Sequence, residues 1–282
     1  MQSLYQVWKS NSNIGNTGWT INGSSVAGIR TSMYIPELKI LLDAGHQIFN
    51  KVAEIFITHS HADHVASLPL IILENVNNKI VTNIYCPQES IKFIENMVEA
   101  FLACNYNNYI IPKKYFNFIS MSPEYLTKRK FNNQSMIIKC YHSDHTVPTI
   151  SYGFIEEKKK LKEEYKGLTG LEIVELKKSG VEITEIKKFK KLVFCGDTTA
   201  KIFSRNPDIL NYDSIVIECT FFEEEEVGTA RERKHMHWND LKKVIISNPN
   251  VNFYLIHISA KYHNIDDFSK MYFNDISNVF IL

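Results

Sequence analysis

The sequence predicts an α/β fold in which short buried strands alternate with helices and end in polar side chains. Three observations support this prediction. Short runs of β-branched and aromatic residues recur along the chain. An amphipathic helical pattern follows one of them over about residues 89–103. Histidines or carboxylates stand directly after several of the runs. Alternation of sheet and helix is typical of a layered α/β domain.

The first element is an antiparallel meander between Gly18 and Asp43. The dipeptides Asn22-Gly23 and Pro36-Glu37 separate its apolar runs, and both are typical of turns. The meander ends at Asp43. Its carboxylate could support a metal site from behind the ligands, or it could be an ordinary turn residue, and the sequence leaves both interpretations open.

The next run, residues 53–58, predicts a buried strand, and it leads into Thr58-His59-Ser60-His61-Ala62-Asp63-His64. The apolar residues 65–73 predict a helix that packs back on the sheet, which leaves the histidines on an exposed loop. Imidazoles and carboxylates are common metal ligands. Three imidazoles and one carboxylate within six positions therefore favour metal binding over a polar turn with incidental histidines.

Later elements repeat this pattern. Residues 80–85 predict a strand, the amphipathic helix follows it, and residues 105–135 give no clear signal. Further strands are expected at residues 136–141, 191–195, 214–220 and 251–257, with a helix that runs to about residue 247. The polar residues that end the strands or lie between them are His59, His61, Asp63, His64, His145, Asp197, Glu218, His235 and His257.

This pooled set of donors suits two metal ions. Imidazole-rich sets prefer zinc, whereas manganese or iron fits where oxygen donors dominate. Two adjacent ions can share a hydroxide and stabilise both oxygens of an in-line displacement, which is hydrolytic chemistry. A histidine that is hydrogen-bonded to a carboxylate can protonate a leaving alkoxide, and His235 with Glu218 would form such a pair.

Residues 155–191 differ in composition from the rest of the chain because they are rich in lysine. The candidate substrate-binding lysines in this segment are Lys158, Lys159, Lys160, Lys177, Lys178, Lys187 and Lys188. Charge runs of this kind are usually solvated helix and loop. The functional interpretation is a protruding arm whose lysines contact phosphates.

Composition sets wider limits. The 282 residues allow one large domain or two modest ones, and the net charge of +1 argues against a polybasic coat for nucleic acid. No apolar stretch approaches the length of a membrane span, and the first residues lack a signal-peptide pattern. The five cysteines are odd in number and mostly lie in apolar runs, which is typical of reduced core residues. We therefore expect an intracellular, cytoplasmic protein with no membrane partner.

The motifs together resemble the metallo-β-lactamase fold and, within it, the short plant-like members of the ribonuclease Z family. The resemblance rests on residues 59–64, on Asp197 in Gly-Asp-Thr and on His257 in Leu-Ile-His-Ile-Ser-Ala-Lys-Tyr. Its most discriminating parts are Glu218-Cys219-Thr220-Phe221, His235-Met236-His237 and His145-Thr146-Val147-Pro148. Residues 162–184 resemble the substrate-binding arm of that family.

The resemblance implies a four-layer αβ/βα sandwich of two mixed sheets flanked by helices, formed by one domain over residues 1–282 with an inserted arm at about residues 155–191. It implies two Zn²⁺ per subunit, with Mn²⁺ or another divalent ion as the alternative. The ligands it implies are His59, His61 and His145 for one ion, Asp63, His64 and His257 for the other, and Asp197 between them. Asp63 would also orient or deprotonate the attacking water, and His235, held by Glu218, would donate a proton.

The resemblance further implies a substrate and an assembly. Members of the family cut precursor tRNA after the tRNA body, which leaves a 3′-hydroxyl on the tRNA and a 5′-phosphate on the trailer. They usually form homodimers in which the arm of one subunit grips tRNA bound at the other. Two alternatives remain. One is a dizinc phosphodiesterase that acts on small phosphodiesters, and the other is an inactive RNA-binding module.

Overall fold

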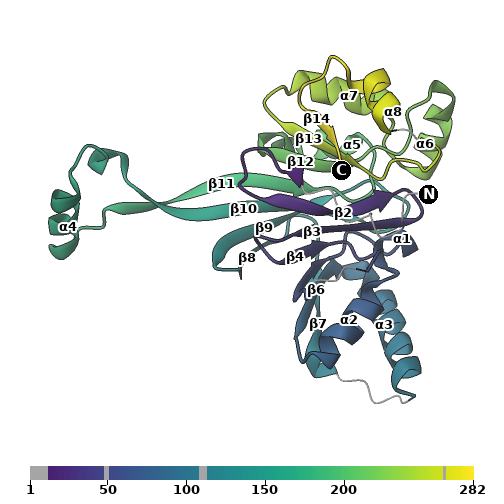
Figure 1. Ribbon diagram of the computed structural model, residues 1–282, viewed down its shortest axis with the longest axis horizontal. Coiled ribbons are helices and arrows are strands. Elements are labelled where there is room, and N and C mark those ends of the chain that lie inside the picture. The colour runs from purple at the N-terminus through teal and green to yellow at the C-terminus, as the bar shows by residue number, and fades with distance from the viewer. Residues whose placement is uncertain (1–11, 48–50, 108–112, 263–264) are drawn as a thin grey trace.

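The computed structural model describes residues 12–47, 51–107, 113–262 and 265–282, and Figure 1 shows how their elements are arranged. Two seven-stranded sheets are formed. The first has the order β1 (Ser12–Asn13), β2 (Thr20–Val26), β3 (Arg30–Ile35), β4 (Ile40–Leu42), β5 (Glu54–Phe56), β6 (Thr82–Pro87), β7 (Phe116–Met121). The second has the order β14 (Val279–Ile281), β13 (Asn252–Ile256), β12 (Ser214–Glu218), β11 (Thr184–Phe194), β10 (Ile150–Leu161), β9 (Gln134–His142), β8 (Leu126–Phe131).

Both sheets are mixed. In each, the strands that come first along the chain pair antiparallel, and the later ones pair parallel, beginning with β4–β5 in the first sheet and β11–β12 in the second. The helices are α1 (Ala62–Val65), α2 (Leu68–Asn77), α3 (Ile91–Tyr106), α4 (Gly170–Lys178), α5 (Lys201–Arg205), α6 (Val227–Arg233), α7 (Trp238–Ser247) and α8 (Ile265–Phe273).

Three apolar clusters define the layers. The central one joins the inner faces of the two sheets and includes Phe56, Tyr152 and Val216. A second packs α2 and α3 on the outer face of the first sheet, and a third packs α5, α7 and α8 on the outer face of the second. The predicted four-layer sandwich of two mixed sheets flanked by helices is confirmed, because apolar surface is buried on both faces of each sheet.

The predicted turn at Asn22-Gly23 is wrong. Strand β2 runs straight through both residues, and the chain turns instead after Val26, where Gly28 adopts a positive φ of 67°. Gly23 serves a different purpose. A Cβ at this position would lie 2.1 Å from the Ser32 carbonyl oxygen of β3, so the glycine permits close approach of neighbouring strands. The turn at Pro36-Glu37 is confirmed, since it joins β3 to β4.

The observed bounds of several other elements differ from the expected ones. The apolar helix expected at residues 65–73 begins at Leu68 and extends to Asn77, and a separate short helix, α1, holds Asp63 and His64, which were expected on a loop. The strand expected at residues 80–85 lies at Thr82–Pro87. The uninformative stretch 105–135 contains the edge strands β7 and β8, of which β8 consists mainly of polar residues.

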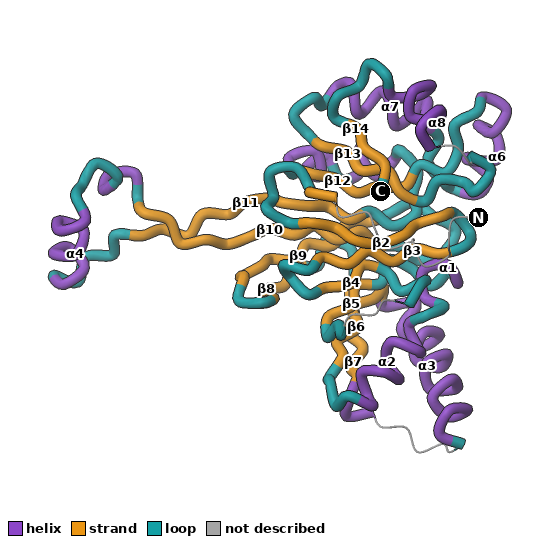
Figure 2. The backbone as a smooth tube through the Cα atoms, in the orientation of Figure 1, coloured by secondary structure: helices purple, strands orange, loops and turns teal. Residues whose placement is uncertain are grey.

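The lysine-rich segment extends away from the body of the molecule, as Figures 1 and 2 show. Strands β10 and β11 continue past the sheet as a two-stranded ribbon, paired from Tyr152 with Phe194 out to Leu161 with Thr184, and α4 lies at its far end. A capping box of Thr169 and Glu172 begins α4. Charge in the segment is mixed, because residues 155–191 hold eleven lysines and eight glutamates.

Two further expectations concern the cysteines and membrane-spanning helices. Cys86, Cys140, Cys195 and Cys219 are buried and unpaired, as expected, whereas Cys104 is unpaired but exposed. Within the described ranges, none of the helices combines the length and apolar character required to cross a bilayer.

Candidate metal centre

The predicted ligands converge at the ends of strands from both sheets. His59 and His61 follow β5, and Asp63 and His64 lie in α1. From the second sheet, His145 follows β9, Asp197 follows β11 and His257 follows β13. The carboxyl ends of parallel strands meet at one edge of a sheet, which explains why residues so far apart in sequence gather here.

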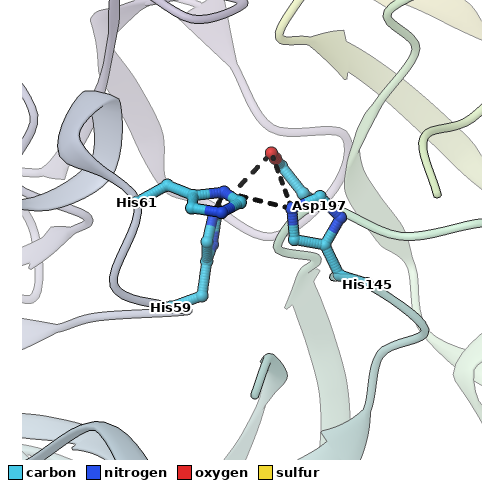
Figure 3. A group of neighbouring side chains, drawn as sticks. All are labelled: His59, His61, His145 and Asp197. Carbon is cyan, nitrogen blue, oxygen red and sulfur yellow. Dashed lines mark hydrogen bonds and ion pairs between the residues drawn. The ribbon is translucent and has the colours of Figure 1, made fainter. Parts of the chain in front are cut away.

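Three groups of side chains could each hold an ion, and in each the candidate ligand atoms all lie within 4.8 Å of one another. The first contains His59, His61, His145 and Asp197, and the second contains Asp63, His64 and His257. The third, Asp197 with His235 and His257, shares a residue with each of the other two. The first group is drawn in Figure 3, where the three imidazoles and the carboxylate point toward a common centre. Asp197 links the groups, since its Oδ2 is 3.7 Å from His59 Nε2 and 3.5 Å from His257 Nε2.

In each buried candidate ligand, one imidazole nitrogen faces the centre and the other forms a hydrogen bond that orients the ring. His64 Nδ1 donates to Asp43 Oδ2 at 2.8 Å, and His145 Nδ1 donates to the Lys234 carbonyl at 3.0 Å. The hydroxyls of Thr58 and Thr220 donate to Asp43 and Glu218, so they accept from His59 Nδ1 and His257 Nδ1, both at 3.0 Å. The Nε2 lone pairs are thereby aimed at the centre, as in proteins where outer hydrogen bonds orient metal ligands.

Of the two interpretations of Asp43, support of the metal loop is confirmed. Its carboxylate is fully buried and accepts from the Thr58 amide at 2.7 Å as well as from His64. Sequence reasoning did not assign a role to Thr58, Thr220 or the Lys234 carbonyl. The two threonines directly follow strands, as the ligands do, but only the tertiary structure shows which imidazole each one holds.

The donor set fits a divalent cation. His64 Nε2 is buried and has no hydrogen-bond partner among the described residues, and a buried polar atom without a partner is costly. His61 Nδ1 lies 3.1 Å from His59 Nε2 and 3.2 Å from His145 Nε2, although it can donate a proton to only one of them. These separations are close to the ~3.3 Å between imidazole nitrogens on a tetrahedral zinc with bonds of about 2.0–2.1 Å.

Electrostatics agree with this fit. Burial lowers the pKa of His59, His61 and His145, which favours the neutral imidazole that binds metals. Burial alone would raise the pKa of Asp197, but His257, His64 and His59 hold it well below its usual range, so the carboxylate stays ionised. Burial would lower the pKa of His64, but the nearby carboxylates of Asp197 and Asp43 outweigh it and raise this pKa to about 9. The two carboxylates thus favour a positive charge at this position.

The predicted pair of His235 and Glu218 is formed beside the centre. His235 Nδ1 donates to Glu218 Oε1 at 2.8 Å, and this carboxylate is fully buried at the end of β12. Burial would lower the pKa of His235, but Glu218 outweighs it and raises the pKa to about 9. His235 Nδ1 is also 3.8 Å from Asp197 Oδ2. The neighbouring His237 instead caps α7, because its Nδ1 accepts from the Asn239 amide.

The candidate arm lysines lie away from this centre, on the ribbon and on α4. Lys160 and Lys187 line a shallow cavity of about 420 Å³ together with Lys166 and Phe189. Lys158 and Lys187 are paired with Glu156 and Glu185, at 2.8 Å and 3.2 Å. Lys177 and Lys178 lie in the last turn of α4.

Comparison with known proteins identifies the family. The tRNase Z TRZ1 of Arabidopsis thaliana is 30% identical over 251 residues, and the alignment covers 87% of each chain. The chain belongs to the tRNase Z, or ribonuclease Z, family. The chloroplastic tRNase Z TRZ2 of the same plant is 27% identical over 254 residues, covering 87% of this chain and 69% of the relative. A family model described as anti-Pycsar protein Apyc1 matches residues 36–162.

Solved structures agree on the fold of this tRNase Z family member. The metallo-β-lactamase fold protein YhfI of Bacillus subtilis superposes with a TM-score of 0.61 at 14% identity, covering 92% of this chain and 94% of the other. The short form of human tRNase Z superposes with a TM-score of 0.58, also at 14% identity and with the same coverage. The metallo-β-lactamase fold expected from the sequence motifs is therefore confirmed.

Proposed function

We propose that the protein is a metal-dependent endoribonuclease that removes the 3′ trailer from precursor tRNA. The observation that carries the proposal is the Glu218–His235 pair beside the ligand groups, in a chain 30% identical to a plant tRNase Z. Ligand groups alone would suit many hydrolases of this fold. A proton donor is useful where an alkoxide leaves, as it does when a phosphodiester is cleaved.

The proposed ligands form two sets that share one carboxylate. His59, His61 and His145 would hold one ion, Asp63, His64 and His257 the other, and Asp197 would contact both. Zinc is the ion we propose, because imidazole nitrogens dominate the donors, with manganese as the alternative. When bound, such ions lower the pKa of water and stabilise negative charge on phosphoryl oxygens.

The side chains supply the remaining chemistry. Asp63 lies at the open side of the centre, with its Oδ2 3.1 Å from His257 Nε2, and would orient the attacking water and accept its proton. The water oxygen forms a bond to phosphorus while the bond from phosphorus to the tRNA 3′-oxygen breaks. His235, held through Nδ1 by Glu218, presents Nε2 and would protonate that oxygen. The products are a tRNA 3′-hydroxyl and a trailer 5′-phosphate.

Substrate positioning is assigned to the arm. We propose that the ribbon of β10 and β11 with α4 contacts the tRNA body through its lysines, and that two copies of the chain form a homodimer in which each arm serves the other centre. Support comes from the protrusion of the arm, which carries α4 away from the body of the molecule (Figure 1). Lysine is a common contact for backbone phosphates.

The proposal is tested by incubating purified protein with a 3′-extended precursor tRNA and mapping the cut. We expect one cut after the tRNA body, a free 3′-hydroxyl, and loss of cleavage when a chelator is added. Asp63→Ala should abolish cleavage in the presence of metal. Hydrolysis of a small phosphodiester without any cut in the tRNA would favour the small-substrate alternative, and RNA binding without hydrolysis of either would favour an inactive binding module.

A further inference from the structure

A second charged cluster lies directly against the candidate metal centre. Asp144 precedes the candidate ligand His145, and its side chain is only 9% exposed. Asp144 Oδ2 accepts from the Thr199 hydroxyl at 3.0 Å and lies 3.1 Å from Lys201 Nζ. Asp144 Oδ1 lies 3.5 Å from Lys234 Nζ. Two ammonium groups therefore share one carboxylate, and the cluster keeps a net positive charge.

The two lysines remain open to solvent although their partner is buried. The Lys201 side chain is 66% exposed and that of Lys234 is 44% exposed. Each ammonium carries three N–H donors, so donors remain after the contact with Asp144. One lysine would neutralise this carboxylate. The positive charge of the second lysine is not balanced by this carboxylate, whereas an ion pair that serves only the fold needs a single lysine.

The cluster lies next to residues of the centre. Among the proposed catalytic groups, His235 and Asp63 retain exposed side-chain surface, 14% and 12%, whereas Glu218 is fully buried. Lys234 directly precedes His235, and Lys234 Nζ donates to the His145 carbonyl at 3.2 Å. The cluster is therefore adjacent to a candidate ligand, His145, and to the proposed proton donor, His235.

We propose that Lys201 and Lys234, positioned by Asp144, bind the RNA backbone phosphate next to the scissile one. The inference rests on the proposed function, since it names a contact of the same substrate at the same centre. Lysine binds phosphate as a compact point charge, and the buried carboxylate between the two lysines reduces their mutual repulsion and holds both ammonium groups beside the centre.

The test measures cleavage of 3′-extended precursor tRNA as a function of salt. The variants are Lys201→Met, Lys234→Met and the charge-retaining Lys201→Arg, with Lys92→Met at an exposed position of α3 as the matched control. Each methionine variant at the cluster should raise KM about tenfold more than it lowers kcat. Its plot of log(kcat/KM) against log[salt] should become shallower by about 0.7, because one fewer counterion is released.

The same variants are assayed with bis(p-nitrophenyl) phosphate, which has no neighbouring phosphate. We expect the ratio of kcat/KM for RNA to that for the small ester to fall in both cluster variants, to be restored by Lys201→Arg, and to keep its wild-type value in Lys92→Met. An unchanged salt slope in Lys201→Met, or equal losses on both substrates, would overturn the phosphate contact. If wild-type protein leaves the RNA intact, the proposed function is wrong, and the ligand of the two lysines is then not an RNA phosphate.

Discussion

At the scale of single residues, the centre depends on which nitrogen of each imidazole is free. Asp43, Thr58, Thr220 and the Lys234 carbonyl each take one ring nitrogen of a candidate ligand, and Glu218 does the same for His235. These hydrogen bonds select the tautomer and the ring orientation before any ion binds, so little rearrangement is needed on binding.

The proton-donor role predicts a kinetic defect without loss of metal. His235→Ala should lower the single-turnover rate of precursor-tRNA cleavage by about 10²–10⁴-fold, the usual contribution of a positioned general acid. Metal content of the purified variant, measured by atomic absorption, should equal that of the wild type. Since His235 also forms a candidate ligand group with Asp197 and His257, a variant that loses an ion would show that His235 is a ligand rather than the proposed donor.

At the scale of elements, the close approach of neighbouring segments places the metal loop. The chain after β4 packs against α1 through Gly45, whose amide donates to the Thr31 carbonyl at 2.9 Å. A Cβ on Gly45 would lie 1.7 Å from the Asp63 carbonyl oxygen. The main chain at Asp63 cannot move aside as a flexible side chain would. The lack of a side chain at Gly45 therefore allows the main chain at Asp63 to occupy its observed position.

Gly45→Ala should therefore damage both stability and the centre. We expect the free energy of unfolding to fall by about 1–3 kcal/mol, as in overpacked interiors, and zinc affinity to fall with it. Urea denaturation and competition with a chromophoric chelator measure the two quantities. The matched control is Gly228→Ala in α6, where a Cβ meets nothing within 4 Å and should stabilise the helix by about 0.5–1 kcal/mol. Equal stability of Gly45→Ala and wild type would contradict this account.

The arm is an element that can be shortened without entering the core. Glu157 pairs with Lys188 across the ribbon, whereas Glu156 and Lys191 are buried at its base. Replacing residues 158–187 with an Asn-Gly turn should close the ribbon as a tight hairpin. We expect precursor-tRNA cleavage to be lost while hydrolysis of bis(p-nitrophenyl) phosphate persists. Undiminished tRNA cleavage would refute the assignment of the arm to substrate binding.

At the scale of the whole molecule, the centre joins the two sheets. His59, His61, Asp63 and His64 come from the first sheet and its connections, and His145, Asp197 and His257 come from the second. The central apolar cluster lies between the same two sheets. An ion bound by both sets would add a polar link to this apolar contact, so metal binding should stabilise the entire fold rather than one loop.

Metal removal should accordingly lower the thermal midpoint. With free zinc at about 100 times its Kd, linkage contributes ~2.7 kcal/mol, which corresponds to a rise of roughly 5–10 °C for a protein of this size. Circular dichroism melts of protein with zinc and of protein treated with chelator measure the difference. Identical midpoints at saturating zinc would show that the sheets are not linked through the ligands.

The sequence by itself determined the strand-end positions of the ligands and the layered architecture. His59, Asp197 and His257 each follow an apolar run, and such runs fold as strands wherever both faces are buried. Sequence also singled out Glu218 and His235, although they are 17 residues apart. These features could be recognised because an apolar run predicts a strand and the type of the polar residue that follows it indicates its chemistry.

Only the tertiary structure decided what depends on contacts between distant segments. Gly23 permits close strand packing instead of a turn, because its neighbour across the sheet sets the available space. Strand β8 escaped recognition, since it is an edge strand made mainly of polar residues, and the edge strand β7 escaped although four of its six residues are apolar. The pairing of Lys201 and Lys234 on Asp144, and the hydrogen bond that orients each imidazole, join residues up to 90 positions apart. No local pattern encodes such contacts, because they arise only when the two sheets pack together.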